Sequence, residues 1–244
     1  FTVSDDHLNL MALRIEEAKA VFEHQYGVKY DISMSVQKPS TDTVAANMDG
    51  TPYRENGELF FRPGGHGALI ENLNDLDGDV IFIKNIDNVV PDSFRESTIT
   101  YKQVIGGVLV EAKNRIDQYA EALRNGMASE ADMNEMLQFM RQTLCITNDN
   151  AESMTADEKK QYILAKLNRP IRVCGMVRNE GEPGGGPFLA FNEDGTVSPQ
   201  ILESTQINPD DATAVEMLQK ATHFNPVDLV CYTRDLDGNK FDLT

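Results

Sequence analysis

The first quarter of the chain alternates between helix and strand patterns. After Ser4, apolar residues recur every three or four positions until Gly27, which predicts a first helix between these two residues. Tyr30–Val36 then alternates between apolar and polar side chains, as a half-buried strand does. Gln37–Gly57 is polar and rich in turn residues, and Gly67–Leu76 has the spacing of a short helix. This alternation predicts an α/β protein.

A second strand is predicted at Val80–Ile83, where every residue is apolar. Such a run is typical of a central parallel strand that is covered on both faces. It is followed by the polar segment Asn85–Asn88. Ligands of open α/β sheets bind beyond the carboxyl ends of their strands, where we expect Asp87 to lie. A carboxylate in that place is a natural ligand for a phosphate-bound Mg²⁺.

The composition of the pattern changes after this strand. Ser129-x-x-Asp132 and Thr155-x-x-Glu158 are typical starts of helices. We interpret residues 95–168 as a helical insertion within one α/β domain that covers residues 1–244. Apolar residues repeat there at helical spacing, at Val104, Val108, Ala112, Ile116, Tyr119 and Leu123 and again at Met133, Met136, Leu137, Met140 and Leu144.

The strand pattern returns after the helical segment. It is found at Ile171–Arg178, Phe188–Phe191, Gln200–Glu203 and Val227–Tyr232, with a helix expected at Pro209–Ala221. From the apolar runs and their order we expect one sheet that contains the first and last of these strands, together with Tyr30–Val36 and Val80–Asn85.

Charge and composition restrict the classes of function. The net charge is −17, which argues against nucleic-acid binding by neutralisation of phosphates. No apolar run is long enough to span a membrane. Three cysteines stand far apart in the sequence, which fits reduced thiols in a cytoplasmic protein. The chain starts at Phe1 without a methionine, and we expect it to be a portion of a longer protein.

A glycine-rich loop precedes the short helix at Gly67–Leu76. Residues without Cβ let a ligand approach the backbone, and the helix start offers N–H groups to an anion. Such a loop, taken alone, is more often a simple turn between a strand and a helix. The acidic strand end at Asp87 favours the binding interpretation.

Four segments resemble those of the UDP-sugar pyrophosphorylases, in particular the UTP–glucose-1-phosphate uridylyltransferase type. Gly65–Gly67 (Gly-His-Gly) and Phe82–Asn88 are similar to the paired signature of that family, Ile201–Ile207 to its sugar-contacting Leu-Glu strand, and Phe224–Leu229 to its Phe-Asn-x-Asn-Asn-Leu segment. The wider pattern is also similar to an uncharacterised bacterial family known only as a domain of unknown function.

The resemblance implies a fold and a reaction. The implied fold is that of the nucleotide-diphospho-sugar transferases, a GT-A-like, Rossmann-related α/β fold whose mixed sheet here carries a helical insertion. The implied reaction joins a nucleoside triphosphate, UTP above all, to a sugar 1-phosphate and releases pyrophosphate, with Mg²⁺ as cofactor. In such a transfer the protein positions the reactants and neutralises charge.

The resemblance also implies roles for individual residues. His66 would lie beside the α-phosphate and Asp87 would hold the metal, as the catalytic pair. Structural roles are the alternatives to these functional ones: Asp87 in a simple turn, Glu203 as an exposed edge residue, and a flexible loop at Gly184–Gly186. The implied nucleotide contacts are Gln37, Gly64, Gly65 and Gly67, and the implied sugar contacts are Asn85, Glu203 and Asn225.

The chain departs from the family in several places. Ala68 and Val227 stand where the family has an acidic residue and an asparagine. The Gly-x-Gly-[Thr/Ser]-x-[Leu/Met] triphosphate loop of the family's first strand has no match, so we expect this chain to be weak or inactive alone. Two alternatives stay open: a non-catalytic nucleotide-sugar-binding or regulatory module, and an acidic protein-interaction domain with an apolar patch on its helical segment. Sugar, base and oligomeric state are left open.

Overall fold

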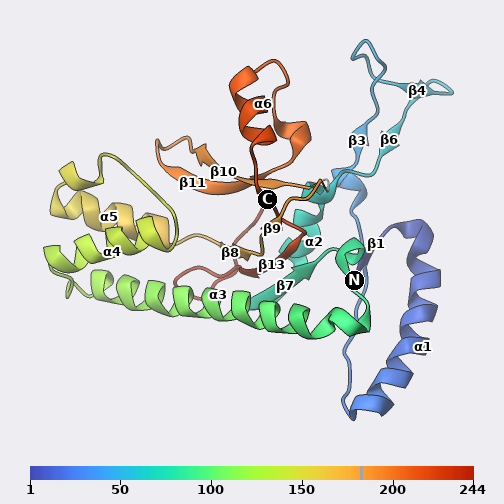
Figure 1. Cartoon of the computed structure of the whole chain (residues 1–244), viewed down its shortest axis with the longest axis horizontal. Coiled ribbons are helices and arrows are strands. Elements are labelled where there is room, and N and C mark those ends of the chain that lie inside the picture. The colour runs from blue at the N-terminus through green and yellow to red at the C-terminus, as the bar shows by residue number, and fades with distance from the viewer. Residues whose placement is uncertain (182–183) are drawn as a thin grey trace. The chain divides into compact units, whose positions relative to one another are not determined.

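The computed structural model describes residues 1–181 and 184–244 (Figure 1). Helices alternate with short strands along the described chain, which confirms the prediction of a mixed α/β protein. The chain divides into two units, one formed by Phe1–Asp77 with Phe241–Thr244 and the other by Gly78–Lys240. In the part of the chain that the structure describes, no helix combines the length and the apolar character needed to cross a membrane.

The first unit opens with the predicted helix. Strand β1 (Thr2–Val3) leads into α1 (Leu8–Tyr26), and Gly27 ends the helix in the left-handed conformation, at φ 64°. The strand expected at Tyr30–Val36 is limited to β2 (Ser35–Val36), which pairs in parallel with β1. The pattern overstated this strand because only its last two residues meet a partner, and β1 is itself two residues long.

The predicted polar loop of the first unit holds two small ladders. β3 (Thr43–Val44) pairs with β6 (Phe61–Arg62), and β4 (Arg54–Glu55) pairs with β5 (Glu58–Leu59). The turn between β4 and β5 is Asn56-Gly57, with positive φ at both residues, as a two-residue hairpin requires. A 3₁₀ turn (His66–Leu69) and α2 (Ile70–Asp75) follow, where the sequence predicts a short helix.

The second unit is built around a three-stranded antiparallel sheet. Its strands are β7 (Val80–Lys84), β8 (Ile171–Cys174) and β13 (Asp228–Tyr232), in the order β7-β13-β8. Val230 of the central strand pairs with residues of both neighbours and is fully buried. Three of the four strands that we expected to share a sheet do so, and Tyr30–Val36 does not.

The prediction that Val80–Ile83 is a central parallel strand is wrong. β7 pairs only with β13 among the described residues, runs antiparallel to it, and so lies at an edge of the sheet. Val80 and Phe82 are 40% and 48% exposed. A continuous apolar run predicts a strand, but it contains no information on the direction or the number of the strands that pair with it.

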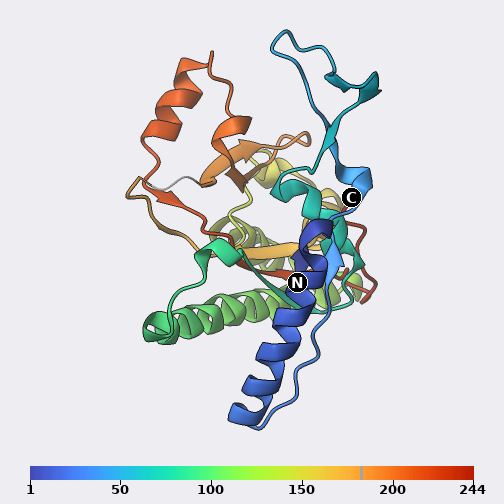
Figure 2. The ribbon, with the colours of Figure 1, turned by 90° about the vertical axis from the view of Figure 1, so that its right-hand side faces the viewer.

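Three helices occupy the predicted helical segment: α3 (Arg95–Arg124), α4 (Glu130–Gln142) and α5 (Ala156–Leu167). Both predicted capping boxes, at Ser129 and Thr155, are formed. α3 lies along the sheet and packs against β8 and β13 (Figures 1 and 2). The core between the three helices contains Ala112, Ile116, Leu123, Met133, Met136, Phe139, Met140, Ile163 and Leu167.

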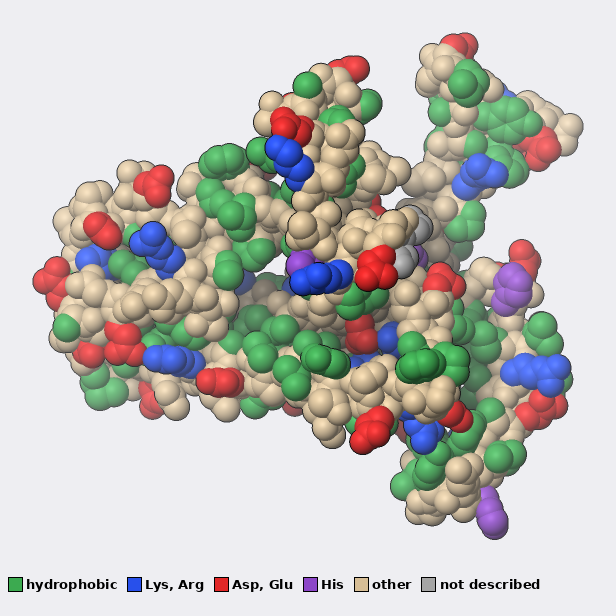
Figure 3. Space-filling model, viewed as in Figure 1, with side chains coloured by type: hydrophobic (Ala, Val, Ile, Leu, Met, Phe, Trp, Pro, Cys, Tyr) green, Lys and Arg blue, Asp and Glu red, His purple; other side chains and the backbone are tan. Residues whose placement is uncertain are grey.

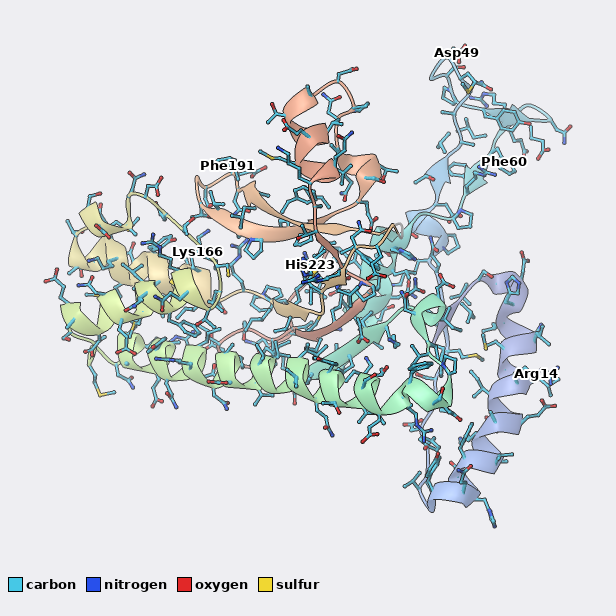
Figure 4. The ribbon with its side chains drawn as sticks, viewed as in Figure 1. Arg14, Asp49, Phe60, Lys166, Phe191 and His223 are labelled. Atoms are coloured by element: carbon cyan, nitrogen blue, oxygen red, sulfur yellow. The ribbon has the colours of Figure 1, made fainter. Side chains whose placement is uncertain are left out.

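The remainder of the second unit is a hairpin and a short ladder. The hairpin consists of β10 (Gly186–Phe191) and β11 (Val197–Leu202). The ladder joins β9 (Val177–Arg178) to β12 (His223–Phe224), and α6 (Ala212–Gln219) connects β11 to β12. Lys166 of α5 (Figure 4) forms an ion pair with Asp194 and donates to the Oγ1 of Thr196, which anchors the hairpin turn to the helices.

Candidate functional site

The charged centre of the second unit is Asp228, the first residue of β13. Its Oδ2 accepts from Lys84 Nζ at 2.8 Å and its Oδ1 accepts from Lys102 Nζ at 2.7 Å. The side chains of Asp228, Lys84 and Lys102 are 19%, 23% and 26% exposed. Burial by itself would raise the pKa of Asp228, but the hydrogen bonds from the two lysines outweigh it and hold the pKa below its ordinary value.

The turn before Asp228 has an unusual backbone. Val227 has φ 53°, a region that a β-branched residue rarely adopts and that costs about 1–3 kcal/mol. Neighbouring amides hold it there: Val227 N donates to Asn225 Oδ1 at 3.0 Å, and Asn85 N donates to the Val227 carbonyl at 3.0 Å. Asn88 Nδ2 donates to the carbonyl of Pro226 at 2.6 Å. The segment Asn85–Asn88 thus clamps the turn that places Asp228.

Asn225 connects this turn to two glycines. It is 5% exposed, its Nδ2 donates to the Gly175 carbonyl at 2.7 Å, and its backbone N donates to the Gly185 carbonyl at 2.8 Å. A Cβ on Gly175 would lie 2.9 Å from the carbonyl oxygen of Asp228, so a larger residue does not fit there. A Cβ on Gly185 would lie 2.9 Å from Glu203 Oε1. Glu203 therefore reaches the same place from the end of β11.

The three residues that the resemblance marks as sugar contacts lie on segments that contact one another. Asn225 bonds to the carbonyls of Gly175 and Gly185, and Glu203 lies beside Gly185. Asn85 bonds through its backbone N to the carbonyl of Val227. The third glycine of the run at Gly184–Gly186 begins β10, so that run forms the entry to a hairpin. Pro183, which precedes it, lies outside the described residues.

Asp87 lies in the 3₁₀ turn that follows Asn85 and is exposed. Its Oδ2 accepts from Asn85 Nδ2 at 3.3 Å. Among the residues that the structure describes, no group of three His, Cys, Asp or Glu side chains gathers as a metal centre would require. Asp87 offers one carboxylate, and this fits a Mg²⁺ that takes its other ligands from phosphate oxygens and water.

The predicted nucleotide contacts lie together in the first unit. Gln37 Nε2 donates to the Gly64 carbonyl at 3.2 Å, next to Thr41. Packing requires glycine at Gly64, because a Cβ there would lie 2.7 Å from the carbonyl oxygen of Thr41. Packing does not require it at Gly65 or Gly67, where a Cβ would meet no atom within 4 Å. The backbone of these two residues is exposed, and their role as nucleotide contacts stays a prediction.

The remaining predicted residue, His66, begins the 3₁₀ turn between Gly65 and α2 and is exposed. The nucleotide set and His66 belong to the first unit, whereas Asp87 and the sugar set belong to the second. The predicted nucleotide contacts lie near one another in the first unit, and the predicted sugar contacts lie on contacting segments of the second. That His66, Asp87 and Glu203 line one cleft stays a prediction.

Sequence reasoning missed the two lysines and the carboxylate between them. Lys84 and Lys102 are 144 and 126 positions away from Asp228 along the chain. Lys84 and Asp228 both lie inside segments that carry the family resemblance, but neither is among the residues to which that resemblance assigns a role. The one available signal was the placement of a lysine at the end of an otherwise apolar strand.

An open cleft of about 370 Å³ lies elsewhere in the second unit, between α3 and the segment after β13. Its cations are engaged by its own acids. Lys113 donates to both carboxylate oxygens of Asp117 and lies 4.5 Å from the ring centroid of Tyr232, and Arg124 pairs with Asp237. None of the predicted site residues lines this cleft.

One comparison decides the family. The family model described as "Domain of unknown function (DUF4301)" matches residues 1–244. The chain belongs to this family. Neither the comparison with curated proteins nor the comparison with solved structures gives a match. The DUF4301 membership agrees with the similarity to an uncharacterised family that the sequence pattern indicates, and the function has to be argued from the residues of the site.

Proposed function

We propose that this DUF4301 chain binds a nucleotide and a sugar phosphate and belongs functionally with the nucleotidyltransferases that form nucleotide sugars and release pyrophosphate. One observation supports the proposal most. Asn88 and Asn85 bond to the backbone of Pro226 and Val227, and Glu203 reaches Gly185 beside Asn225. Three separate segments that carry the family resemblance thereby contact one another in the second unit.

The proposed fold relationship is weaker than the site. The GT-A-like arrangement predicts a central parallel strand before Asp87, whereas β7 is an antiparallel edge strand among the described residues. The proposal therefore rests on the contacts between these three segments and not on the sheet.

Each residue of the site would have a definite task. The amide of Asn85 and the carboxylate of Glu203 would orient the sugar, since hydroxyl groups bind to paired donors and acceptors. The buried Asn225, whose side-chain amide is bonded to the Gly175 carbonyl and to the N–H of Val227, would hold the turn beside them. In the first unit, Gln37 and the open backbone at Gly65 and Gly67 would hold the base and the ribose, with His66 near the α-phosphate. Asp87 would hold Mg²⁺, which neutralises phosphate charge when bound.

The test begins with binding. Isothermal titration of the chain with UTP and with UDP-glucose, each with and without Mg²⁺, should show binding that Mg²⁺ strengthens for UTP. Asp87→Asn should remove the effect of Mg²⁺, while Asp92→Asn, an exposed acid in the next turn, should leave it unchanged. Failure of both ligands to bind at millimolar concentration would contradict the proposal.

Two features favour a binding module without catalysis as the second candidate. Residues 1–244 contain no match to the family's Gly-x-Gly-[Thr/Ser]-x-[Leu/Met] triphosphate loop, and Asp87 is the one carboxylate that the resemblance offers to a metal. Pyrophosphate release from UTP and glucose 1-phosphate separates the two. Turnover supports the transferase, and tight binding of the nucleotide sugar without turnover supports the module.

An apolar surface on α3 favours the remaining alternative, a protein-interaction domain. Tyr101, Val104 and Val108 are 69%, 51% and 45% exposed and lie on one side of the helix, away from the buried Leu109 and Ile116. Figure 3 shows hydrophobic side chains along the length of this helix. This alternative is tested by Tyr101→Lys with Val104→Lys, which should abolish self-association or partner binding and leave nucleotide binding intact.

A further inference from the structure

We propose that Lys84 and Lys102 form a binding site for the phosphate groups of a small anionic ligand, and that Asp228 holds their two ammonium groups in position for it. The inference deepens the proposed function by naming the residues that contact phosphate, and it relies on that function only for the identity of the ligand. The two lysines have no counterpart among the residues that the family resemblance implies.

The first argument is the local balance of charge at Lys84, Lys102 and Asp228. The protein has a net charge of −17, so a place where cations locally exceed carboxylates is favoured for the binding of an anion. Two ammonium groups converge on the two oxygens of one carboxylate, at 2.8 and 2.7 Å, which leaves one positive charge in excess. The side chains of both lysines are only about a quarter exposed, so solvent screens this charge less than it would on the surface.

The second argument is the number of N–H donors that the two lysines offer. An ammonium group has three N–H donors. In the described part of the chain, Lys84 and Lys102 each give one hydrogen bond, to Asp228. Each therefore keeps donors for a phosphate oxygen without breaking the existing pairs. Asp228 brings the two ammonium groups to the same carboxylate, so that one phosphate group has two cationic donors within its reach.

The third argument is the rigidity of the backbone around Asp228. Asp228 follows a strained residue, Val227, whose conformation the amides of Asn85 and Asn225 maintain. A Cβ at Gly175 would be 2.9 Å from the Asp228 carbonyl oxygen, which shows how closely the chain surrounds it. Backbone strain of this kind persists where the surroundings over-determine it, and it is concentrated at functional sites. A simple ion pair at an edge of a sheet needs no such support.

The probe for the test is inorganic pyrophosphate in EDTA, so that Asp87 and any metal take no part. Binding is measured by titration calorimetry at low salt with the wild type, Lys84→Met, Lys102→Met and Asp228→Asn. Lys113→Met is the matched control, because Lys113 lies on the same helix as Lys102, is paired with a carboxylate and stands over an aromatic ring. Far-ultraviolet dichroism checks folding, and Lys102→Gln replaces any methionine variant that does not fold.

We expect each lysine variant to weaken the binding of pyrophosphate about tenfold or more, since hydrogen bonds to charged groups contribute that much. Asp228→Asn should also weaken binding, because it removes the carboxylate that holds the two ammonium groups in position. Lys113→Met should change nothing. In the wild type, the backbone amide signals of Val227 and Asp228 should shift on titration in a ¹⁵N-resolved NMR spectrum.

Absence of pyrophosphate binding by the wild type would overturn the inference, as would equal losses in Lys102→Met and Lys113→Met. Parallel titrations with UDP and uridine identify the source of the phosphate, since a free anion predicts no gain for UDP over pyrophosphate. Lysine-dependent pyrophosphate binding without any nucleotide binding would contradict the proposed function alone. Nucleotide binding that does not depend on Lys84 and Lys102 would contradict this inference alone.

Discussion

Asn88 donates a hydrogen bond of 2.6 Å to the backbone carbonyl of Pro226, which lies 138 positions later in the chain. This bond joins the turn after β7 to the turn before β13, at the point where β7 ends and β13 begins. Asn85 makes the neighbouring contact, from its backbone N to the carbonyl of Val227. The two asparagines thus give the candidate site a fixed backbone frame.

Loss of this bond should be measurable. Asn88→Ala leaves the Pro226 carbonyl without its donor in a half-buried place, and we expect the free energy of unfolding to fall by about 1–2 kcal/mol. Urea denaturation followed by dichroism measures the difference. Asn47→Ala, which removes an exposed side-chain bond to Thr51, serves as the control and should change stability by less than about 0.5 kcal/mol. Equal effects in the two variants would show that the frame is not held by Asn88.

The left-handed residue Val227 predicts a stabilising substitution. Asparagine tolerates positive φ much better than a β-branched residue, so Val227→Asn should raise the free energy of unfolding by about 1 kcal/mol. Thermal unfolding tests this, with Val177→Asn as a strand control that should give no gain. A lower melting temperature for Val227→Asn would mean that the apolar contacts of Val227 outweigh its strain.

Two adjacent glycines of α3 should respond in opposite ways to alanine. A Cβ at Gly107 would meet no atom within 4 Å, so Gly107→Ala should stabilise the protein by about 0.5–1 kcal/mol through helix propensity. A Cβ at Gly106 would lie 2.8 Å from the ring of Phe82, so Gly106→Ala should lose that gain or destabilise the protein. The difference in melting temperature between the two variants is the measurement. Equal gains would place Phe82 away from α3.

The lowered pKa of Asp228 predicts how stability depends on acid. Because the folded protein binds the proton of Asp228 less tightly than the unfolded chain does, the ion pairs with Lys84 and Lys102 contribute fully above the unfolded pKa of about 3.9. Their contribution should disappear as the pH falls through the folded pKa. The stability difference between the wild type and Asp228→Asn should therefore shrink from pH 6 to pH 3. A constant difference over that range would contradict the assignment.

Local signals in the sequence determined the helices and their ends. Ser129 with Asp132 and Thr155 with Glu158 form the predicted capping boxes, and Gly27 ends α1 as predicted, in the left-handed conformation. Such ends depend on residues three or four positions apart, so the sequence alone contains the necessary information. It also located three of the four expected sheet strands and the polar residues at Asn85 and Asn225.

The tertiary structure alone decided the partners. That β7 is an antiparallel edge strand, and that Val227 adopts a left-handed conformation, depends on chain segments more than 100 positions away. The same holds for Lys84 and Lys102, which meet at Asp228 only because β7, α3 and β13 pack together. An apolar run or a single lysine has the same local pattern whatever it packs against. Strand order and the composition of the site are therefore set by long-range packing, which periodicity does not encode.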